Sequence, residues 1–251
     1  HHQLEKYSND PQKKELIYLI SKILGRLFSM TKKLKLGVLI SGRGSNLRSL
    51  IEATKRHNFP AEITIVIANA PSTPGLELAK AENIPLRTIN HKDFNERKTF
   101  EDELHNVLIA AKVELICLAG FMRILTDHFI NLWLDKIINI HPSLLPSFKG
   151  LNTRNRVLKS GAKFSGCTIH FVRPEMDDGP IIIQAVVAIE QNDTADSLAN
   201  RILVEEHKIY PIAVELIASK KVSIVNGRVK LKSTTSPSSA LLNPCQTSIQ
   251  P

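Results

Sequence analysis

The sequence predicts an α/β domain with a doubly wound, mostly parallel sheet, and three observations lead to this class. Short apolar runs alternate with amphipathic helical patterns along most of the chain, which is the order expected of βαβ units. A glycine-rich loop at 42–47 joins the first strand pattern to the first helical pattern. Two late strand patterns then follow each other without a helix, which favours an antiparallel pair towards the C-terminal end of the sheet.

The individual elements follow from the spacing of apolar residues. The run at 115–118 is apolar throughout, as in a strand that is buried on both faces. Thr194 is a suitable N-cap for the last helix, which Pro211 should kink. Strands are predicted at 36–41, 63–68, 86–89, 115–118, 137–140, 167–172 and 181–188, and helices at 46–56, 75–82, 95–111, about 128–134 and about 193–219.

The chain divides into three parts. Residues 1–33 form an N-terminal extension whose apolar residues have helical spacing over 13–28. This basic amphipathic segment can be an appended helix, a targeting segment or upstream codons translated ahead of a start at Met30, and His1-His2 can be the remnant of a tag. We expect an appendage without a role in the chemistry. Residues 34–231 form the domain, and 232–251, rich in Ser, Thr and Pro, should be a disordered tail.

The net charge of +9 is concentrated at the two ends of the sequence. Residues 1–35 hold eight Lys and Arg against three Asp and Glu, and residues 220–251 hold five against none, which leaves twenty against twenty-one between them. Because a nucleic-acid site needs a basic surface on the folded domain, this distribution argues against nucleic acid as a partner. No apolar run approaches the roughly 20 residues of a membrane span. We therefore expect small-molecule partners only.

The three cysteines, Cys117, Cys167 and Cys245, lack the spacing of metal ligands. Cys117 and Cys167 lie inside apolar strand patterns, where a small hydrophobic side chain fits. Buried, reduced thiols are typical of a cytoplasmic protein, so we expect that location and no metal. The oligomeric state is open between monomer and homodimer.

The loop from Gly42 to Leu47 should form an anion site, because backbone N–H groups at a helix start point towards bound anions. A dinucleotide site is disfavoured, since Leu47 stands where a third glycine belongs and the second strand ends in Asn69 rather than an acid. The lysine of a Walker A motif is also missing. The loop therefore predicts a holder for one phosphate, with donors from Ser45 and Asn46. The simpler alternative is an ordinary capped helix start.

Three further polar residues are expected at strand ends. Asn139 and His141 lie two residues apart at the end of the fifth strand, where Pro142 and Pro146 fix a loop, and alternate residues of a strand share a face. Asp177 lies in the turn between the last two strands. Each has an ordinary structural explanation, such as turn formation or a satisfied polar group. Together, an amide, an imidazole and a carboxylate can hold an oxyanion and move a proton during acyl transfer.

Five motifs in order resemble the folate-dependent phosphoribosylglycinamide formyltransferase family, over about residues 35–231. They are Val38-Leu39-Ile40-Ser41-Gly42-Arg43-Gly44-Ser45-Asn46, Leu118-Ala119-Gly120-Phe121-Met122-Arg123-Ile124-Leu125, Asn139 to Pro146, Asp177-Asp178-Gly179-Pro180, and Glu206-His207-Lys208-Ile209-Tyr210-Pro211.

The resemblance implies a Rossmann-like formyltransferase fold and transfer of a formyl group from 10-formyltetrahydrofolate, as co-substrate, to the amine of glycinamide ribonucleotide. It implies that Asn139 and His141 stabilise the oxyanion, while Asp177 orients His141 and assists proton transfer through water. Met122, Ile124 and Leu125 can equally be core residues, and His170 can be an ordinary polar strand residue. The other roles that it implies are phosphate binding by Gly44, Ser45 and Asn46, ribonucleotide binding by Glu206, and folate binding by Arg97, Met122, Arg123, Ile124 and Leu125.

Two positions depart from the pattern of the family: Asp178 stands where glycine is usual, and Arg154 where histidine is common. Asp178 would either place a second carboxylate near His141 or alter the turn, and so affect the pH dependence rather than the reaction.

Other functions fit the sequence less well. A formyltetrahydrofolate deformylase should have an N-terminal regulatory domain and a histidine at Pro142, and a methionyl-tRNA formyltransferase should have a C-terminal RNA-binding domain. A catalytically silent nucleotide-binding protein would have lost part of the Asn139, His141 and Asp177 trio. An NAD oxidoreductase is disfavoured by the glycine loop.

Overall fold

The computed structural model describes residue 15 and residues 32–232 and 236–244. The predicted N-terminal helix at 13–28 lies outside these residues except for Glu15. The chain separates into one unit at His1–Lys33 and a second at Leu34–Pro251, and the description below concerns the second.

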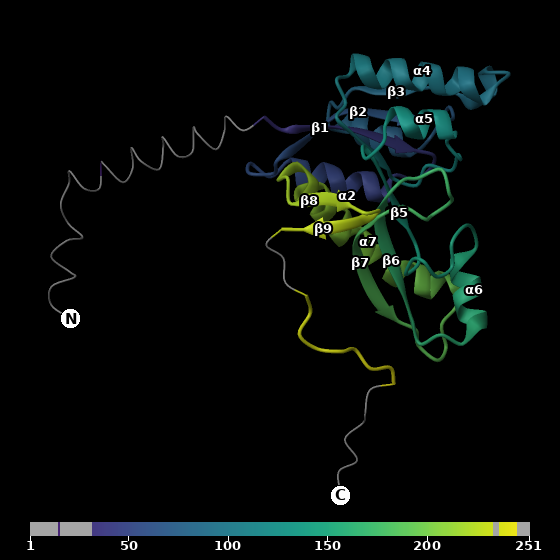
Figure 1. The fold of residues 1–251 in the computed structure, drawn as a ribbon. Coiled ribbons are helices and arrows are strands. Elements are labelled where there is room, and N and C mark those ends of the chain that lie inside the picture. The colour runs from purple at the N-terminus through teal and green to yellow at the C-terminus, as the bar shows by residue number, and fades with distance from the viewer. Residues whose placement is uncertain (1–14, 16–31, 233–235, 245–251) are drawn as a thin grey trace, which may run out of the picture. The chain divides into compact units, whose positions relative to one another are not determined.

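A seven-stranded sheet forms the centre of this unit, in the order β3-β2-β1-β4-β5-β6-β7 (Figure 1). The first five strands pair in parallel, whereas β6 runs antiparallel to both β5 and β7. This confirms the predicted doubly wound, mostly parallel sheet that ends in an antiparallel pair. The strands are β1 (Leu34–Ile40), β2 (Ala61–Ala68), β3 (Leu86–Thr88), β4 (Leu115–Leu118), β5 (Ile137–His141), β6 (Phe164–Phe171) and β7 (Ile181–Ala188).

Helices cover both faces of the sheet, and each face has its own apolar core. On one face, α2, α3, α6 and α7 pack through residues such as Leu50 and Ile202. On the other, α4 and α5 pack through residues such as Leu104 and Phe129, and Figure 1 shows α4 and α5 on the side opposite α2 and α7. The helices are α2 (Ser45–Thr54), α3 (Gly75–Ala81), η2 (His91–Asp93), α4 (Arg97–Ala110), α5 (Asp127–Leu132), α6 (Thr153–Ser160) and α7 (Ala195–Ala218).

The strand order reverses between β1 and β4, and this reversal positions the candidate site. The loop after β1 leads to α2 on one face, while the segment after β4 leads to α5 on the other. The two loops meet at their start, because Ser41 N donates to Gly120 O at 3.2 Å and Ser41 Oγ accepts from Met122 N at 2.8 Å. In open α/β sheets such a reversal leaves a crevice at the carboxyl ends of the strands.

Some elements, among them the single turn η2, were not predicted from the sequence. α6 was not predicted, because its sequence holds only Val157 and Leu158 as apolar residues and so shows no helical period. The hairpin of β8 (Val222–Val225) and β9 (Arg228–Leu231) was not predicted either. Its turn, Asn226-Gly227, has positive φ at both residues, and Asn-Gly is a strong hairpin signal that could have revealed it.

The last helix and the tail complete the unit. α7 is capped by Thr194, whose side chain accepts from Ser197 N, and contains Pro211. In the described part of the tail, Asn243 Nδ2 donates to Lys163 O and Ile189 O at 2.6 and 2.9 Å, next to the paired ends of β6 and β7. The disorder predicted for 232–251 stays a prediction.

Candidate active site

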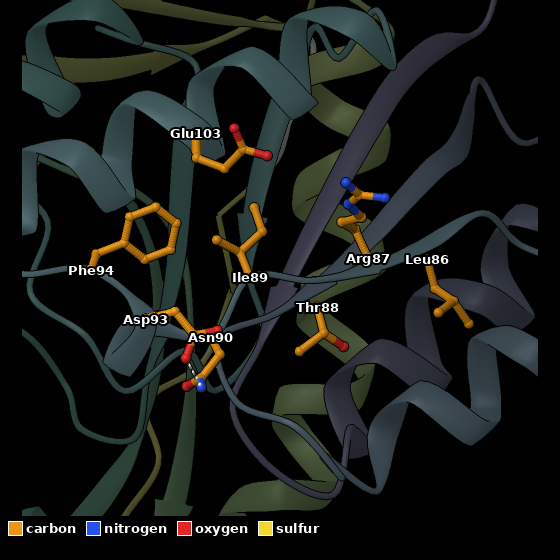
Figure 2. A pocket seen from close by; sticks show the side chains of 8 residues that line it. All are labelled: Leu86, Arg87, Thr88, Ile89, Asn90, Asp93, Phe94 and Glu103. Carbon is orange, nitrogen blue, oxygen red and sulfur yellow. Dashed lines mark hydrogen bonds between the residues drawn. The ribbon is translucent and has the colours of Figure 1, made fainter.

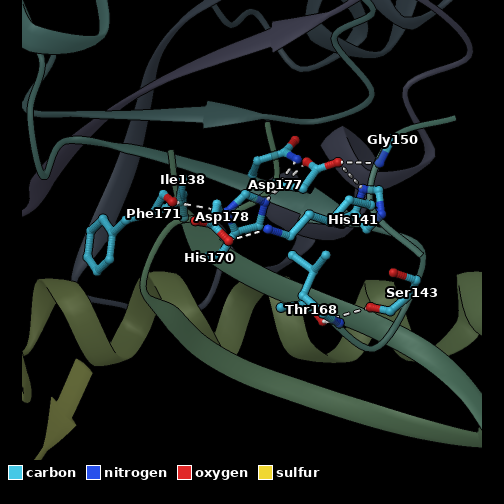
Figure 3. A network of polar contacts seen from close by, with 12 residues as sticks. Ile138, His141, Ser143, Gly150, Thr168, His170, Phe171, Asp177 and Asp178 are labelled. Carbon is cyan, nitrogen blue, oxygen red and sulfur yellow. Dashed lines mark hydrogen bonds and ion pairs between the residues drawn. The ribbon is translucent and has the colours of Figure 1, made fainter. Parts of the chain in front are cut away.

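The predicted trio comes together at one end of β5 and the turn that joins β6 to β7, and Figure 3 shows His141 and Asp177 of this trio side by side. Asn139 and His141 lie two residues apart on β5, where their main chains pair with His170 and Thr168 of β6. The carboxylate of Asp177 lies between the two histidine rings, with Oδ2 at 3.3 Å from His141 Nδ1 and Oδ1 at 3.8 Å from His170 Nε2. Asn139, His141 and Asp177 are therefore members of one contact network.

The His141 ring is almost completely buried and fixed from both sides. Nε2 lies 3.0 Å from Phe148 O, and Nδ1 faces the Asp177 carboxylate. Because a carbonyl oxygen only accepts, Nε2 carries the proton that it shares with Phe148 O. Nδ1 then faces the Asp177 carboxylate. The bond from Nε2 to Phe148 O therefore sets the orientation of the ring.

The turn that carries Asp177 has an unusual backbone. Asp177 has φ of 52°, in the left-handed region that non-glycine residues rarely adopt. At Gly179 a Cβ atom would lie 1.7 Å from Phe171 O, so only glycine fits there. Asp177 Oδ2 also accepts from Gly150 N at 2.8 Å. The turn is held by contacts to residues far away in the sequence, as is usual for strained functional segments.

His170 is a member of this network that sequence reasoning placed behind the catalytic residues, without a partner. Its Nδ1 lies 3.0 Å from Phe171 O and its Nε2 lies 3.3 Å from Asn139 Nδ2. Burial lowers the pKa of His170, although the Phe171 carbonyl and the Asp177 charge act in the opposite direction. A neutral ring with its proton on Nδ1 satisfies both contacts, since Nε2 can then accept from the amide of Asn139. The alternation of the strand predicted a polar residue there, but not its partner.

Thr168 and Ser143 hold the loop that follows β5. Thr168 Oγ1 donates to Ser143 O at 2.7 Å and accepts from Leu145 N at 3.1 Å. Ser143 Oγ donates to Ser147 O at 2.7 Å and approaches Phe148 O at 3.2 Å. Since both side chains are buried, these bonds fix the path of the chain up to the carbonyl that contacts His141.

The two departures from the family pattern have partners in the structure. Asp178 is exposed and its carboxylate pairs with Lys149 Nζ. Arg154 is exposed in the first turn of α6. Burial raises the pKa of Glu206, and the charge of Arg154 acts against that rise.

The glycine loop and Glu206 also come together. Gly44 is the N-cap of α2 and has φ of 77°, and a Cβ there would meet the Cα of Gly75 at 2.9 Å. The buried Asn46 Nδ2 donates to Glu206 Oε2 at 2.7 Å, while Asn46 Oδ1 is buried without a partner among the described residues. Burial raises the pKa of Glu206, and the bond from Asn46 acts in the opposite direction. Ser45 is half-buried in the first turn of α2, where backbone N–H groups lack intrahelical acceptors.

The predicted folate residues divide into exposed and buried ones. Met122 and Ile124 are 74% and 62% exposed, which excludes core packing for both. Leu125 belongs to the core on the α4 and α5 face. Arg123 is half-buried, and Arg97 is exposed at the first residue of α4.

One pocket, of about 540 Å³, is lined by residues of β3, η2 and α4 and of the segments between them (Figure 2). It is adjacent to β3, at the edge of the sheet, whereas the trio lies at β5, beyond β2, β1 and β4 in the strand order. Its lining contains none of the predicted site residues, and its residues are Leu86, Arg87, Thr88, Ile89, Asn90, Asp93, Phe94 and Glu103.

Two features are absent from residues 15, 32–232 and 236–244. These residues contain no cluster of three or more His, Cys, Asp or Glu that could hold a metal ion. Within the same ranges, no helix combines the length and the apolar character required to span a membrane.

Comparison with known proteins identifies the class. The family model described as formyl transferase matches residues 34–214, and the chain therefore belongs to the formyl transferase family. Within it, the phosphoribosylglycinamide formyltransferase of Haemophilus influenzae is 37% identical over 209 residues, which cover 83% of this chain and 99% of that protein. The crystal structure of the phosphoribosylglycinamide formyltransferase of Anaplasma phagocytophilum matches with a TM-score of 0.76 and 45% identity, covering 82% of this chain and 97% of that one. The resemblance predicted from the five motifs is confirmed.

Longer proteins also contain a similar segment. The trifunctional purine biosynthetic protein adenosine-3 of Chironomus tentans is 52% identical over 196 residues, which cover 77% of this chain. The chain spans 14–20% of the length of the trifunctional relatives named adenosine-3 that it matches.

Proposed function

We propose that this chain transfers the formyl group of 10-formyltetrahydrofolate to the amine of glycinamide ribonucleotide, a step of purine synthesis. The observation that carries the proposal is the convergence of Asn139, His141 and Asp177 on one point at the end of β5. Membership of the formyl transferase family and the similarity to phosphoribosylglycinamide formyltransferases support the substrate pair. The products are formylglycinamide ribonucleotide and tetrahydrofolate.

The trio would act on the developing negative charge. The amine nitrogen attacks the formyl carbon, and the carbonyl electrons move to the oxygen, where hydrogen-bond donors lower the barrier. Asn139 Nδ2 has two protons and donates one towards His170, so the second is available to the formyl oxygen. His141 would donate from Nδ1 when both ring nitrogens carry a proton, and this N–H would be shared between the Asp177 carboxylate and the formyl oxygen. When the intermediate collapses, the folate nitrogen leaves and gains a proton, while the amine loses one.

Asp177 would have two roles in this scheme. Its Oδ2 lies 3.3 Å from His141 Nδ1 and would hold the imidazole in its orientation. It would also take up the proton of the attacking amine through a water molecule. Because Gly150 N donates to the same oxygen, the position of the carboxylate is fixed before substrate binds, as electrostatic catalysis requires.

The substrates would occupy the two loops that diverge at the reversal of the strand order. We assign the phosphate to the first turn of α2 at Gly44, Ser45 and Asn46, supported by its backbone N–H groups. Glu206 and the unpartnered Asn46 Oδ1 would bind the rest of the ribonucleotide.

The folate would lie along the segment after β4. Met122 and Ile124 are supported as folate contacts by their exposure, and Arg123 and Arg97 by a charge that suits the acidic tail of a folate. Leu125 lies in the core beneath this segment, so we assign it to the support of the segment rather than to contact with the folate.

The location and assembly of the protein are also proposals. We propose a cytoplasmic protein, supported by the free, buried Cys117 and Cys167. Burial raises the pKa of both thiols and keeps them protonated. We propose a monomer or homodimer, which sedimentation of the purified protein would distinguish.

A two-substrate assay tests the activity. The purified protein should release tetrahydrofolate and formylated ribonucleotide from the two substrates without added metal. Omission of glycinamide ribonucleotide should abolish the release. Equal release without the ribonucleotide would identify a deformylase instead, and tight ribonucleotide binding with no release would identify a silent nucleotide-binding protein.

A further inference from the structure

An ion pair joins the loop after β5 to the turn that carries Asp177. Lys149 Nζ contacts Asp178 Oδ1, with 37% and 53% of the two side chains exposed. Lys149 is the residue between Phe148, whose carbonyl contacts His141, and Gly150, whose N–H contacts Asp177. Asp178 directly follows Asp177. The pair therefore connects the two segments that contact His141 and carry Asp177.

Both segments contain backbone conformations that require support. Phe148 and Asp177 have φ of 56° and 52°, and Gly150 has φ of 78°. Left-handed conformations in non-glycine residues are unfavourable and persist when surrounding contacts hold them. On the Lys149 side, Arg156 Nη1 also donates to Lys149 O at 2.5 Å. The loop thus depends on a small set of contacts, of which the Lys149–Asp178 pair is the one made between two charged side chains.

We propose that Lys149 is a positioning residue for formyl transfer, which through its ion pair with Asp178 holds Phe148 O on His141 and Gly150 N on Asp177. This inference rests on the function proposed above. It also explains how the chain tolerates an acid at 178, because the ammonium group balances a carboxylate that would otherwise lie unpaired beside Asp177. Lys149 acts through the loop and needs no contact with substrate.

The size of the effect follows from the exposure of the pair. Half-exposed ion pairs contribute about 0.2–1 kcal/mol, which corresponds to a roughly 1.4- to fivefold change in a rate constant. Lys149→Ala and Asp178→Asn should each lower kcat by a factor in this range and leave both KM values within about twofold of the wild type. Because the two residues act as one unit, the double variant should lose no more than either single one.

Lys55→Ala is the matched control. Lys55 pairs with Glu82 at 2.7 Å, its side chain is 46% exposed, and it lies at the C-terminal end of α2. Its kinetics should match those of the wild type. A higher KM for either anionic substrate in Lys149→Ala, with no change in Asp178→Asn, would overturn the proposal, because Lys149 would then bind substrate directly.

The pH profile separates positioning from a general loss of structure. In Lys149→Ala an unbalanced carboxylate next to Asp177 favours the cationic form of nearby groups, so the alkaline limb of kcat/KM should move to higher pH. In Asp178→Asn an unbalanced ammonium group has the opposite effect and should move the limb to lower pH. The double variant should return to the wild-type position. Shifts of the same sign in both single variants would contradict the pairing. The titratable groups beside His141 are Asp177 and His170. Lys149 and Asp178 pair with each other on the two adjoining segments, and Arg156 contacts the carbonyl of Lys149.

A measurement without substrate keeps this proposal separate from the proposed function. Hydrogen exchange of the Gly150 amide should be faster in Lys149→Ala and in Asp178→Asn than in the wild type and in Lys55→Ala, since the amide is protected by its bond to Asp177. Unchanged exchange in both variants would overturn the positioning role even if the enzyme is active. If exchange is faster in both variants but the wild type transfers no formyl group, the positioning role is supported and the proposed function is wrong.

Discussion

The phosphate side and the formyl side of the candidate site are built in different ways. On the phosphate side, residues 42–47 follow a strand and lead into the first turn of a helix, and the proposed donors are backbone N–H groups of that helix start. On the formyl side, the trio comes from β5 and a distant turn, and it is held by the loop of Phe148 and Gly150. The first arrangement is fixed by local structure and the second by tertiary contacts.

The carboxylate on each side shows the same difference. Glu206 is buried on α7, accepts from Asn46 and has a raised pKa because of burial. Asp177 is on a turn in a left-handed conformation, with three polar neighbours from three segments: His141, His170 and Gly150. A rigid helix suits a binding group. A turn that depends on several contacts suits a catalytic group, but it makes activity more sensitive to substitution than binding.

The largest expected effect separates the two sides. His141→Ala and Asp177→Asn should each lower kcat by about 10²–10⁴, the range for groups that stabilise charge or transfer protons in the transition state. The dissociation constant of glycinamide ribonucleotide should stay within about threefold, because the phosphate side remains intact. Single-turnover formyl transfer and calorimetric binding measure the two quantities.

His57→Ala and Asp196→Asn are suitable controls, since both residues are exposed and lie outside the site. Near-normal turnover in His141→Ala or Asp177→Asn would remove the roles assigned to them. A parallel loss of ribonucleotide binding would instead show that the two sides are not independent.

A smaller effect tests how Asn139 is held. His170→Leu removes the acceptor for Asn139 Nδ2 and should lower kcat about tenfold, which corresponds to the roughly 1.4 kcal/mol of one hydrogen bond. His170→Gln should recover most of the activity, because its amide can accept from Asn139 and donate to Phe171 O. If both variants are equally slow, the loss comes from packing rather than from the orientation of Asn139.

The fold was predictable from the sequence where the signal is local and periodic. The strand at 115–118 and the helix start near Asn46 were predicted closely, because apolar spacing and a glycine loop decide them. α6 was missed because a polar helix of eight residues has no period to detect. The Asn226-Gly227 hairpin was missed although its turn carries a signal, which shows that turn chemistry deserves the same weight as periodicity.

The site was predictable as far as strand ends bring residues together. Asn139 and His141 follow from the alternation of a strand, and their convergence with Asp177 was expected from motifs. The sequence did not predict that His170 contacts Asn139 or that Lys149 pairs with Asp178. Both contacts depend on the path of loops between distant elements. The exposure of Met122 beside the burial of Leu125 likewise required the structure, since both residues are apolar.

The smallest expected effect concerns stability and belongs to the phosphate side. Burial raises the pKa of Glu206 above its ordinary value of 4.5, so the folded protein binds this proton more tightly than the unfolded chain does. The free energy of unfolding should therefore fall as the pH rises from about 4.5 through the raised pKa. The variant Glu206→Gln cannot ionise at this position, so its stability relative to the wild type should increase over that range.

Urea unfolding at a series of pH values measures the difference. Glu205→Gln is the neighbouring control, because Glu205 is half-buried and pairs with Lys208. A difference between Glu206→Gln and the wild type that does not change with pH would mean that Glu206 ionises normally in the folded protein, and that the contrast between the two carboxylates is one of geometry alone.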